Sequence, residues 1–233
     1  MAGALAGTGF DVVGVLGHGD PTQSAGVGVD LLLIATPDDV IGEVARAVQP
    51  NDSTVVAHMS GSLGLDVLAP HDLRAAVHPL VALPDAETGA RRLRDGAWFA
   101  VAGDHIAIDL VEALGGRPFE VSDQHRAEYH AAAVIASNHL VALLGQAERV
   151  AAAAGIPFEA ILDLVKVTID NVVELGPAAA LTGPAARGDE ATIERHLASL
   201  DPDEVDAYEV LADEARRLSG RPTRRRGSEG HRP

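Results

Sequence analysis

One predicted helix carries polar side chains in a stretch otherwise rich in Ala, Val and Leu. His130, Ser137 and Asn138 lie within nine residues of one another. At about 100° per residue, Ser137 falls within roughly 20° of His130 and Asn138 within roughly 80°, so the three could line one cleft. His139 lies about 180° from His130, which excludes a metal shared by these two histidines.

Imidazole is the side chain that exchanges a proton near neutral pH. We therefore predict His130 as a proton donor, with Ser137 and Asn138 as its catalytic partners. The alternative is that His130 and Asn138 only satisfy each other, or nearby backbone, in a buried helix contact. Placed after an α/β half, the polar helix predicts a site between two domains.

A second polar stretch, residues 181–189, reads Leu-Thr-Gly-Pro-Ala-Ala-Arg-Gly-Asp and leads into a predicted helix. We predict that Thr182 and Arg187 bind substrate, because a guanidinium can hold a carboxylate through two hydrogen bonds. Asp189 is predicted to cap the helix that follows. The Arg-Gly-Asp tripeptide also occurs in adhesion motifs, but nothing in the sequence indicates secretion.

Two more polar positions follow predicted strands, where open α/β sheets bind their ligands. His78 precedes Pro79, which keeps it out of helical geometry. It is either a substrate contact or a structural histidine that donates to backbone. Ser60 and Gly61 belong to a Ser-Gly-Ser turn that could hold a carboxylate or a ribose, or could cap the next helix.

Short apolar runs alternate with helical stretches in the first half of the chain. The predicted strands span residues 11–16, 30–36, 54–58, 75–78, 97–102 and 118–121. The predicted helices span residues 38–48, 63–68 and 105–114, and residues 1–9 read as the last turns of another helix. Since the strand at 30–36 is apolar at every central position, we predict an α/β fold with a parallel sheet.

From Asp123 onward only helical patterns occur, and no repeat is visible. The predicted helices span residues 123–154, 157–175, 190–200 and 203–218. We therefore predict an α/β domain at 1–122, an all-helical C-terminal domain at 123–218 and a disordered basic tail at 219–233.

The composition limits the class of protein. Apolar residues make up 47% of the chain but aromatic residues only 3%, so the core must consist mainly of Ala, Val and Leu. The absence of cysteine excludes disulfides, thiolate chemistry and zinc–cysteine sites. No apolar run reaches about 18 residues and no signal peptide is visible, which predicts a cytoplasmic protein without membrane contact.

The formal net charge of −16 is unevenly distributed. Residues 216–233 contain seven Arg and one acid, Glu229, which leaves about −22 on residues 1–215. Residues 1–215 are acidic enough to repel nucleic acid, and we therefore predict no nucleic-acid partner. The tail is either an arm that binds a polyanion or a solvated segment without a specific role.

The start of the chain lacks a feature of dinucleotide-binding βαβ units. In these units a strand and the loop G-x-G-x-x-G precede the first helix, and the loop amides hold the pyrophosphate. Gly3, Gly7 and Gly9 do not have this spacing and follow no predicted strand. The fingerprint is therefore absent.

Four motifs in this order resemble one family. They are His58-Met-Ser-Gly-Ser62, His78-Pro79, Tyr129-His130 to Asn138-His139, and Thr182 to Asp189. The chain is similar, from about residue 2 to residue 215, to bacterial Rossmann-like proteins whose C-terminal half is the domain of unknown function 2520. These are distant relatives of pyrroline-5-carboxylate, ketopantoate and 6-phosphogluconate dehydrogenases.

The resemblance implies an oxidoreductase that uses reduced nicotinamide to reduce a small keto or imino acid. It implies a Rossmann-like nucleotide-binding domain in which Thr36 and Pro37 lie beside the nicotinamide ribose, and Ser60 and Gly61 contact the cofactor. His18 follows the strand at 11–16 and could touch a 2′-phosphate, which favours NADP over NAD on the strength of one loop.

Relatives often use a lysine as the acid on the interdomain helix. Lys166 is the sole lysine of this chain and lies elsewhere, so His130 takes that role in our prediction. Because the helical domain is Ala-rich with little aromatic packing, we also predict a homodimer formed through it.

The missing first strand and glycine loop depart from the family pattern. Either the gene start is placed too far downstream, or this branch has lost the usual cofactor binding. The alternative function is therefore a non-catalytic ligand-sensing or scaffold protein that retains the fold. A sheet without its first strand would also leave a backbone edge unpaired.

Overall fold

The structure of the protein is a computed structural model that describes residues 1–223. The chain divides into two compact units, the first Met1–Leu140 and the second beginning at Val141. The change from strands to helices comes earlier, because the last strand ends at Glu120. Of the predicted basic tail, residues 224–233 lie outside the described residues.

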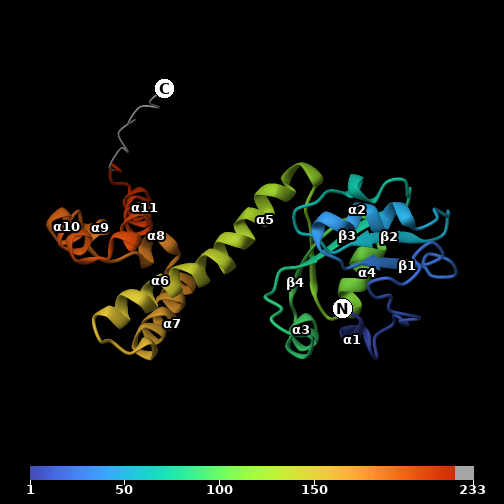
Figure 1. The fold of residues 1–233 in the computed structure, drawn as a ribbon, viewed down its shortest axis with the longest axis horizontal. Coiled ribbons are helices and arrows are strands. Elements are labelled where there is room, and N and C mark those ends of the chain that lie inside the picture. The colour runs from blue at the N-terminus through green and yellow to red at the C-terminus, as the bar shows by residue number, and fades with distance from the viewer. Residues whose placement is uncertain (224–233) are drawn as a thin grey trace, which may run out of the picture. The chain divides into compact units, whose positions relative to one another are not determined.

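The first unit contains a five-stranded sheet (Figure 1). Its strands, in spatial order, are β1 (Leu31–Ile34), β2 (Val55–His58), β3 (Arg74–Pro79), β4 (Trp98–Gly103) and β5 (Arg117–Glu120). The pairs β1–β2, β2–β3 and β4–β5 are parallel, whereas β3–β4 is antiparallel. The predicted α/β class is confirmed, with one antiparallel pair that the strand patterns did not reveal.

Alternating side chains of the strands build a core on each face of the sheet. Val55 and Ala57 pack in the same cluster as α1 (Ala2–Leu5), α3 (Ala86–Leu93) and α4 (Ile106–Ala113). Val56 points the other way, into a second cluster with α2 (Asp38–Ala47) and η1 (Leu65–Leu68). This alternation explains why apolar residues fill successive positions of each strand.

The strand predicted at residues 11–16 is wrong. Residues 11–16 form neither helix nor strand, and Val13 and Val15 are 77% and 74% exposed. A strand needs a partner for its backbone groups. The sheet order begins at β1, whose outer edge is paired neither with residues 11–16 nor with any other strand among residues 1–223.

The helix α3 was not predicted. Asp85 caps it by accepting a hydrogen bond from the backbone N–H of Thr88 at 2.8 Å, and two arginines, Arg91 and Arg92, lie in its last turn. The connection from β3 through α3 returns to the same edge of the sheet, so that β4 runs antiparallel to β3.

The remaining elements are helical. They are η2 (Asp123–His125), α5 (Arg126–Val134), the π-helical turn η3 (Ile135–His139), α6 (Leu140–Ala153), α7 (Phe158–Leu175), α8 (Pro177–Ala180), α9 (Pro184–Arg187), α10 (Glu190–Ser199) and α11 (Pro202–Leu218). The predicted long helices at 157–175, 190–200 and 203–218 agree with α7, α10 and α11 within one residue at each end.

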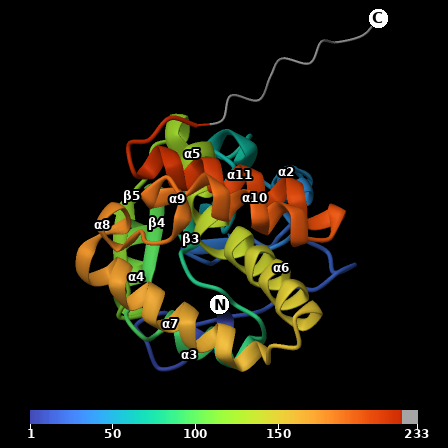
Figure 2. The same cartoon turned by 90° about the vertical axis from the view of Figure 1, so that its left-hand side faces the viewer.

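In the second unit α10 and α11 lie side by side (Figure 2). Arg216 is 3% exposed and pairs with Glu190 at 2.8 Å and with Asp213 at 2.6 Å. Such a buried guanidinium requires carboxylate partners of this kind. Among residues 1–223, no helix has the length and apolar character needed to cross a membrane.

Candidate functional site

Polar side chains gather at the edge of the sheet where β1, β2 and β3 end. Asp38 comes shortly after β1, the turn Ser60-Gly61-Ser62 comes directly after β2, and His78 is the penultimate residue of β3. Since these three strands are parallel, their carboxyl ends meet at one edge. Open α/β sheets bind ligands at this edge.

Asp38 holds the Ser-Gly-Ser turn in place. Its Oδ2 atom accepts hydrogen bonds from Ser60 Oγ at 2.6 Å and from Ser62 Oγ at 2.9 Å. Ser60 Oγ in turn accepts from the backbone N–H groups of Ser62 and Leu63, each at 3.1 Å. The hydroxyl of the buried Ser60 therefore makes its hydrogen bonds within the protein. This agrees with the prediction that the Ser-Gly-Ser turn caps the segment that follows it.

Two buried basic side chains lie beneath this turn. His58 is 0% exposed, and its Nδ1 accepts from the Ser60 backbone N–H at 3.2 Å. Burial, and next the positive charge of Arg126, lower the pKa of His58 to about 4, so the ring is neutral at physiological pH. The nearby Gly64 backbone partly opposes this lowering of the His58 pKa. His58 Nε2 itself has no hydrogen-bond partner among the described residues.

Arg126 is only 1% exposed. Its Nη1 donates to the Ser60 carbonyl at 3.3 Å, and its Nε lies 3.7 Å from Asp123 Oδ1. Burial lowers the pKa of Arg126, whereas the Asp123 charge raises it. The other oxygen of Asp123 accepts from the Leu65 backbone N–H at 2.9 Å, so this carboxylate joins the start of α5 to the loop after β2.

The rings of His78 and His130 meet edge to face next to Gly61. Their centroids are 5.9 Å apart and their planes are nearly perpendicular, at 84°. A Cβ atom added at Gly61 would lie 2.7 Å from His130 Cδ2 and 2.9 Å from His78 Nε2. Glycine is therefore required for both imidazoles to approach this turn. The structure thus brings three of the predicted site residues together.

Tyr129 joins His78 through a short hydrogen bond. Tyr129 Oη and His78 Nδ1 are 2.6 Å apart, and the rings meet edge to face at 5.6 Å and 82°. Burial raises the pKa of Tyr129 to about 12. Burial, then the charges of His130 and Arg126, lower the pKa of His78 to about 4. At neutral pH the phenol is protonated and the His78 ring is uncharged.

An aromatic row leads from this pair to the outer strands. Tyr129 packs edge to face on Phe119 at 5.7 Å, and Phe119 packs in the same way on Trp98 at 6.1 Å. The guanidinium of Arg117 lies 5.2 Å from the centre of a Trp98 ring. These contacts fix the position of Tyr129 against β4 and β5.

Ser137 and Asn138 lie in the π-helical turn η3 and are exposed. Ser137 Oγ donates to the Ala133 carbonyl at 2.7 Å and to Asn138 Oδ1 at 2.9 Å. The angles predicted from 100° per residue do not apply through a π turn, because it is wider than an α-helical turn. Within residues 1–223, no hydrogen bond joins either residue to His130.

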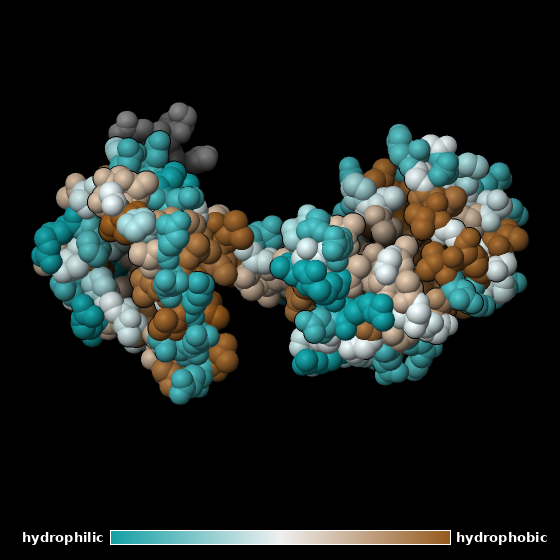
Figure 3. Space-filling view, turned by 90° about the horizontal axis from the view of Figure 1, so that it is seen from below, coloured by the Kyte–Doolittle hydropathy of each residue, from teal (hydrophilic) through white to brown (hydrophobic). Residues whose placement is uncertain are grey.

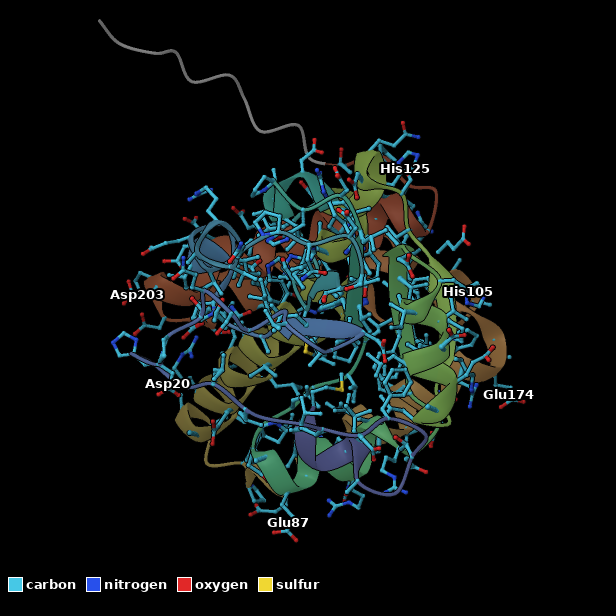
Figure 4. The ribbon with its side chains drawn as sticks, turned by 90° about the vertical axis from the view of Figure 1, so that its right-hand side faces the viewer. Asp20, Glu87, His105, His125, Glu174 and Asp203 are labelled. Carbon is cyan, nitrogen blue, oxygen red and sulfur yellow. The ribbon has the colours of Figure 1, made fainter. Side chains whose placement is uncertain are left out.

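The other predicted cofactor residues lie at exposed positions. Thr36 and Pro37 follow β1, and Pro37 is the N-cap of α2. His18 lies in an exposed turn in which the Gly17 backbone N–H donates to Asp20 Oδ2 at 2.7 Å. Asp20 lies at the periphery of the molecule in Figure 4.

The predicted substrate residues Thr182 and Arg187 belong to the second unit, and both are exposed. Arg187 is the last residue of α9, and Gly188, with a φ of 74°, ends this helix in the left-handed conformation. Asp189 accepts from the Thr192 backbone N–H at 3.1 Å, which confirms the predicted cap of α10.

The sequence analysis did not assign a role to several residues of this site. They are His58, Asp123, Arg126 and Tyr129. Asp38 was expected beside the nicotinamide ribose or as the N-cap of the helix that follows, but Pro37 is the N-cap of α2. His58 and Tyr129 are part of the motifs that carry the family resemblance, and this was the available signal. Asp38 and Arg126 act through tertiary contacts to Ser60, which no local pattern reveals.

The domain of unknown function DUF2520 matches residues 99–215, just over half of the 233 residues. The chain belongs to this family. The predicted resemblance to DUF2520 proteins is thereby confirmed, and two of the four motifs, Tyr129 to His139 and Thr182 to Asp189, lie within the matched residues. No curated protein matches the sequence.

Solved structures share the fold of this DUF2520 protein. Protein TM1727 from Thermotoga maritima is 26% identical, with a TM-score of 0.66 over 81% of this chain and 77% of its own. BF3122 from Bacteroides fragilis, a candidate NADP oxidoreductase, is 22% identical, with a TM-score of 0.66 over 81% and 75%. A 1-pyrroline-5-carboxylate reductase from Streptococcus pyogenes is 16% identical, with a TM-score of 0.53 over 84% and 79%.

The DUF2520 chain fits part of a nicotinamide dinucleotide. The carboxyl edge of the sheet, where open α/β sheets bind ligands, offers the imidazoles of His78 and His130 beside Gly61, whereas the hydroxyls of Ser60 and Ser62 are bonded to Asp38. Within the described residues no glycine-rich loop joins a strand to a helix in the way that holds a pyrophosphate. The imidazoles at the carboxyl edge are therefore the groups available to the reactive end of such a cofactor, and the pyrophosphate end has no matching loop.

Other polar sites of the DUF2520 chain offer less chemistry. Two open depressions share Leu65, Gly103, Asp104 and Asp123 in their lining and contain no imidazole. No group of three or more side chains of metal-binding type gathers anywhere in residues 1–223. The cluster around Gly61 is therefore the candidate site.

Proposed function

We propose that this DUF2520 protein is an oxidoreductase that reduces a small keto or imino acid, with NADP as its nicotinamide cofactor. The observation that carries the proposal is the pair of imidazoles, His78 and His130, that meet over Gly61 at the carboxyl edge of the sheet. The fold likeness to BF3122 and to a pyrroline-5-carboxylate reductase supports it by analogy of fold.

In this proposal the two histidines act on the group that is reduced. Donors placed at a carbonyl oxygen stabilise the negative charge that develops there. His130 delivers the proton, and His78 contacts the substrate. When bound, the nicotinamide supplies the hydride, and Thr36, Pro37, Ser60 and Gly61 are the residues proposed to face it.

The remaining predicted residues keep the roles that the resemblance implied. Ser137 and Asn138 are proposed partners of His130. Thr182 and Arg187 are proposed to bind the substrate carboxylate. His18 is proposed to contact the 2′-phosphate that distinguishes NADP from NAD.

A second candidate is a ligand-sensing or scaffold protein without catalysis. It is favoured by the lack of a glycine-rich pyrophosphate loop in the part of the chain that the structure describes. A scaffold function does not explain why His78 and His130 lie together, because packing alone does not require two neighbouring histidines at this position. For this reason we favour the oxidoreductase.

We also propose that the helical unit forms a homodimer. No residue of α7 is buried, and apolar side chains are exposed along it: Leu164, Val167, Ile169 and Val173, the last at 81%. Figure 3 shows apolar surface over the part of the molecule that contains α6 and α7. An apolar face of this kind is typical of an interface. Sedimentation equilibrium is expected to give twice the monomer mass of 24.1 kDa.

Calorimetric titration of the full chain with NADPH, and separately with NADH, tests the function. We expect a Kd for NADPH in the micromolar range, about −8 kcal/mol of binding free energy. We also expect loss of NADPH absorbance when small 2-keto or cyclic imino acids are added. Absence of binding to a chain shown to be folded by circular dichroism would overturn the redox proposal and favour the second candidate.

A further inference from the structure

Tyr129 and His78 form an isolated pair. Tyr129 Oη and His78 Nδ1, 2.6 Å apart, have no other hydrogen-bond partner within the described residues. Tyrosine has one hydroxyl proton, and a neutral imidazole has one N–H and one bare nitrogen. The pair therefore has two possible arrangements of its protons.

The surroundings favour one arrangement. If Tyr129 donates to Nδ1, its hydroxyl proton and the bare nitrogen satisfy each other. If Nδ1–H donates instead, the phenol proton has no acceptor among the described residues. A half-buried polar hydrogen without a partner costs free energy. The edge-to-face contact with Phe119 holds the Tyr129 ring in line with His78.

The other nitrogen of His78 is available to a ligand. His78 Nε2 has no hydrogen-bond partner within residues 1–223, yet it is not among the fully enclosed nitrogen atoms, as His58 Nε2 is. It lies against Gly61, 2.9 Å from the position that a Cβ atom would take there, and next to the perpendicular ring of His130. A proton on Nε2 therefore lies at the Gly61 turn beside His130, where the proposed function has the substrate bind.

We propose that Tyr129 is a positioning residue that keeps the proton of His78 on Nε2, so that His78 is a neutral hydrogen-bond donor selecting a carbonyl oxygen of a keto acid over an iminium nitrogen. This inference rests on the proposed function and narrows its substrate class. A carbonyl oxygen has lone pairs that accept from N–H, whereas a protonated imine carries N–H and has no lone pair to offer. A neutral donor of this kind polarises the carbonyl without losing its own proton.

The low pKa of His78 agrees with this role. Burial and the charges of His130 and Arg126 lower it to about 4, and only the Asp38 carboxylate opposes the shift. The donor is thus present across the whole neutral range. Tyr129, with its pKa raised to about 12, keeps its proton over the same range.

Two-bond ¹H–¹⁵N correlation spectra of the full chain, labelled at histidine, test the tautomer directly. Loss of a signal in His78→Gln assigns the ring. We expect the wild-type spectrum at neutral pH to show protonated Nε2 and bare Nδ1 at His78. In Tyr129→Phe we expect a mixture of the two tautomers. A wild-type ring protonated on Nδ1 would overturn the inference whatever the protein's activity.

Tyr208→Phe is the matched control, because His196 Nδ1 and Tyr208 Oη are also 2.6 Å apart. It should change the His196 signals and leave those of His78 unchanged. If both variants altered His78 equally, the effect would be a general loss of packing, which contradicts a positioning role.

Substrate selection is tested with a 2-keto acid and a cyclic imino acid side by side. We expect Tyr129→Phe to lower kcat/KM for the keto acid about tenfold, the size of one hydrogen bond, and to change the imino acid little. Equal losses for both substrates would overturn the selection.

If neither acid is reduced, the proposed function fails separately. The donor is then tested by the shift of the His78 Nε2–H signal on addition of the keto acid. We expect that shift in the wild type and a smaller one in Tyr129→Phe, and no shift in the wild type would overturn the inference.

Discussion

The chain contains two histidine–tyrosine pairs of nearly equal geometry. His78 and Tyr129 join strand β3 to helix α5, with the rings at 5.6 Å and 82°. His196 and Tyr208 join neighbouring helices α10 and α11, with the rings at 5.8 Å and 86°. In each pair the Nδ1–Oη distance is 2.6 Å.

The surroundings of the two pairs differ. His78 lies against a second imidazole and beside Gly61, at the end of a parallel strand. The pair of α10 and α11 lies within a helix contact that also contains the ion pair of Arg216 with Glu190. A histidine–tyrosine hydrogen bond can therefore serve packing as well as chemistry, and the groups around the free nitrogen distinguish the two uses.

The largest effect should come from Gly61→Ala, because Gly61 allows His130 to lie next to the His78–Tyr129 pair. Its Cβ would lie 2.7 Å and 2.9 Å from the rings of His130 and His78, so at least one ring must move. We expect turnover to fall on the order of 100-fold. The free energy of unfolding should fall by about 1–3 kcal/mol. Steady-state kinetics and urea denaturation measure the two effects.

Gly145→Ala in α6 is its control. The nearest atom to the new Cβ would be Arg149 Nη1 at 3.7 Å, an ordinary contact. Alanine favours a helix more than glycine does, so we expect a gain of up to about 1 kcal/mol and unchanged kinetics. A Gly61→Ala variant with wild-type turnover would show that the imidazole pair is not needed.

Acid pH should destabilise the first unit, Met1–Leu140, which contains the buried His58 as well as the His78–Tyr129 pair. The pKa of the buried His58 is about 4 in the folded chain, below the ordinary value of 6.5. The unfolded chain then binds more protons between these values, so stability is full above about pH 6.5 and declines as the pH falls toward 4. The loss from His58 amounts to at most roughly 3 kcal/mol.

His58→Asn should flatten this decline, because the amide oxygen can still accept from the Ser60 backbone N–H but does not titrate. His105→Asn is the control. His105 is a surface histidine with a side chain 76% exposed, and it lies at the periphery in Figure 4. Urea denaturation followed by circular dichroism at several pH values makes the measurement, and an unchanged slope in His58→Asn would contradict the assignment.

The two tyrosine variants should be alike in stability and different in function. Tyr129→Phe and Tyr208→Phe each remove one half-buried hydrogen bond, which is worth about 1 kcal/mol. We expect similar shifts in thermal unfolding by calorimetry, with a loss of activity in Tyr129→Phe alone. Equal activity losses would place both pairs in the same class.

The smallest effect should come from Lys166→Ala. Lys166 pairs with Asp163 at 2.9 Å on the surface of α7, with side chains 73% and 76% exposed. Such pairs contribute roughly 0.2–1 kcal/mol or nothing measurable. We expect kinetics equal to those of the wild type. A large loss of activity would instead indicate that Lys166, and not His130, is the acid.

Much of the fold could be predicted because its signals are local. The strands around Leu31, Val55 and Val101 are short apolar runs, and the long helices have continuous helical patterns. Strand direction has no such signal, so the antiparallel pair β3–β4 was not visible in the sequence. The strand at 11–16 failed because a strand depends on a partner elsewhere. The helix α3 was missed although Ala86, Gly89, Ala90 and Leu93 share one face, because Leu93 is the one large apolar residue in this short stripe.

The site could be predicted in part for the same reason. His78, Gly61 and His130 follow strand ends or lie on a polar stretch of helix, and the structure brings them together. The angles drawn for Ser137 assumed an uninterrupted α-helix, whereas a π turn lies at Ile135–His139, so the position of Ser137 could not be derived from the sequence. Asp38, Arg126 and Tyr129 act through contacts across 22 to 66 positions of sequence, which are set by tertiary packing alone.

The aromatic row from Trp98 through Phe119 to Tyr129 gives the protein an optical probe. The chain has one tryptophan and two tyrosines, and one tyrosine lies in each unit. Excitation energy absorbed by Tyr129 can be transferred to the nearby indole of Trp98. The emission of Trp98 therefore reports on Tyr129, which is hydrogen-bonded to His78. Fluorescence of the unlabelled wild-type chain can therefore follow the arrival of a ligand at Gly61 in real time.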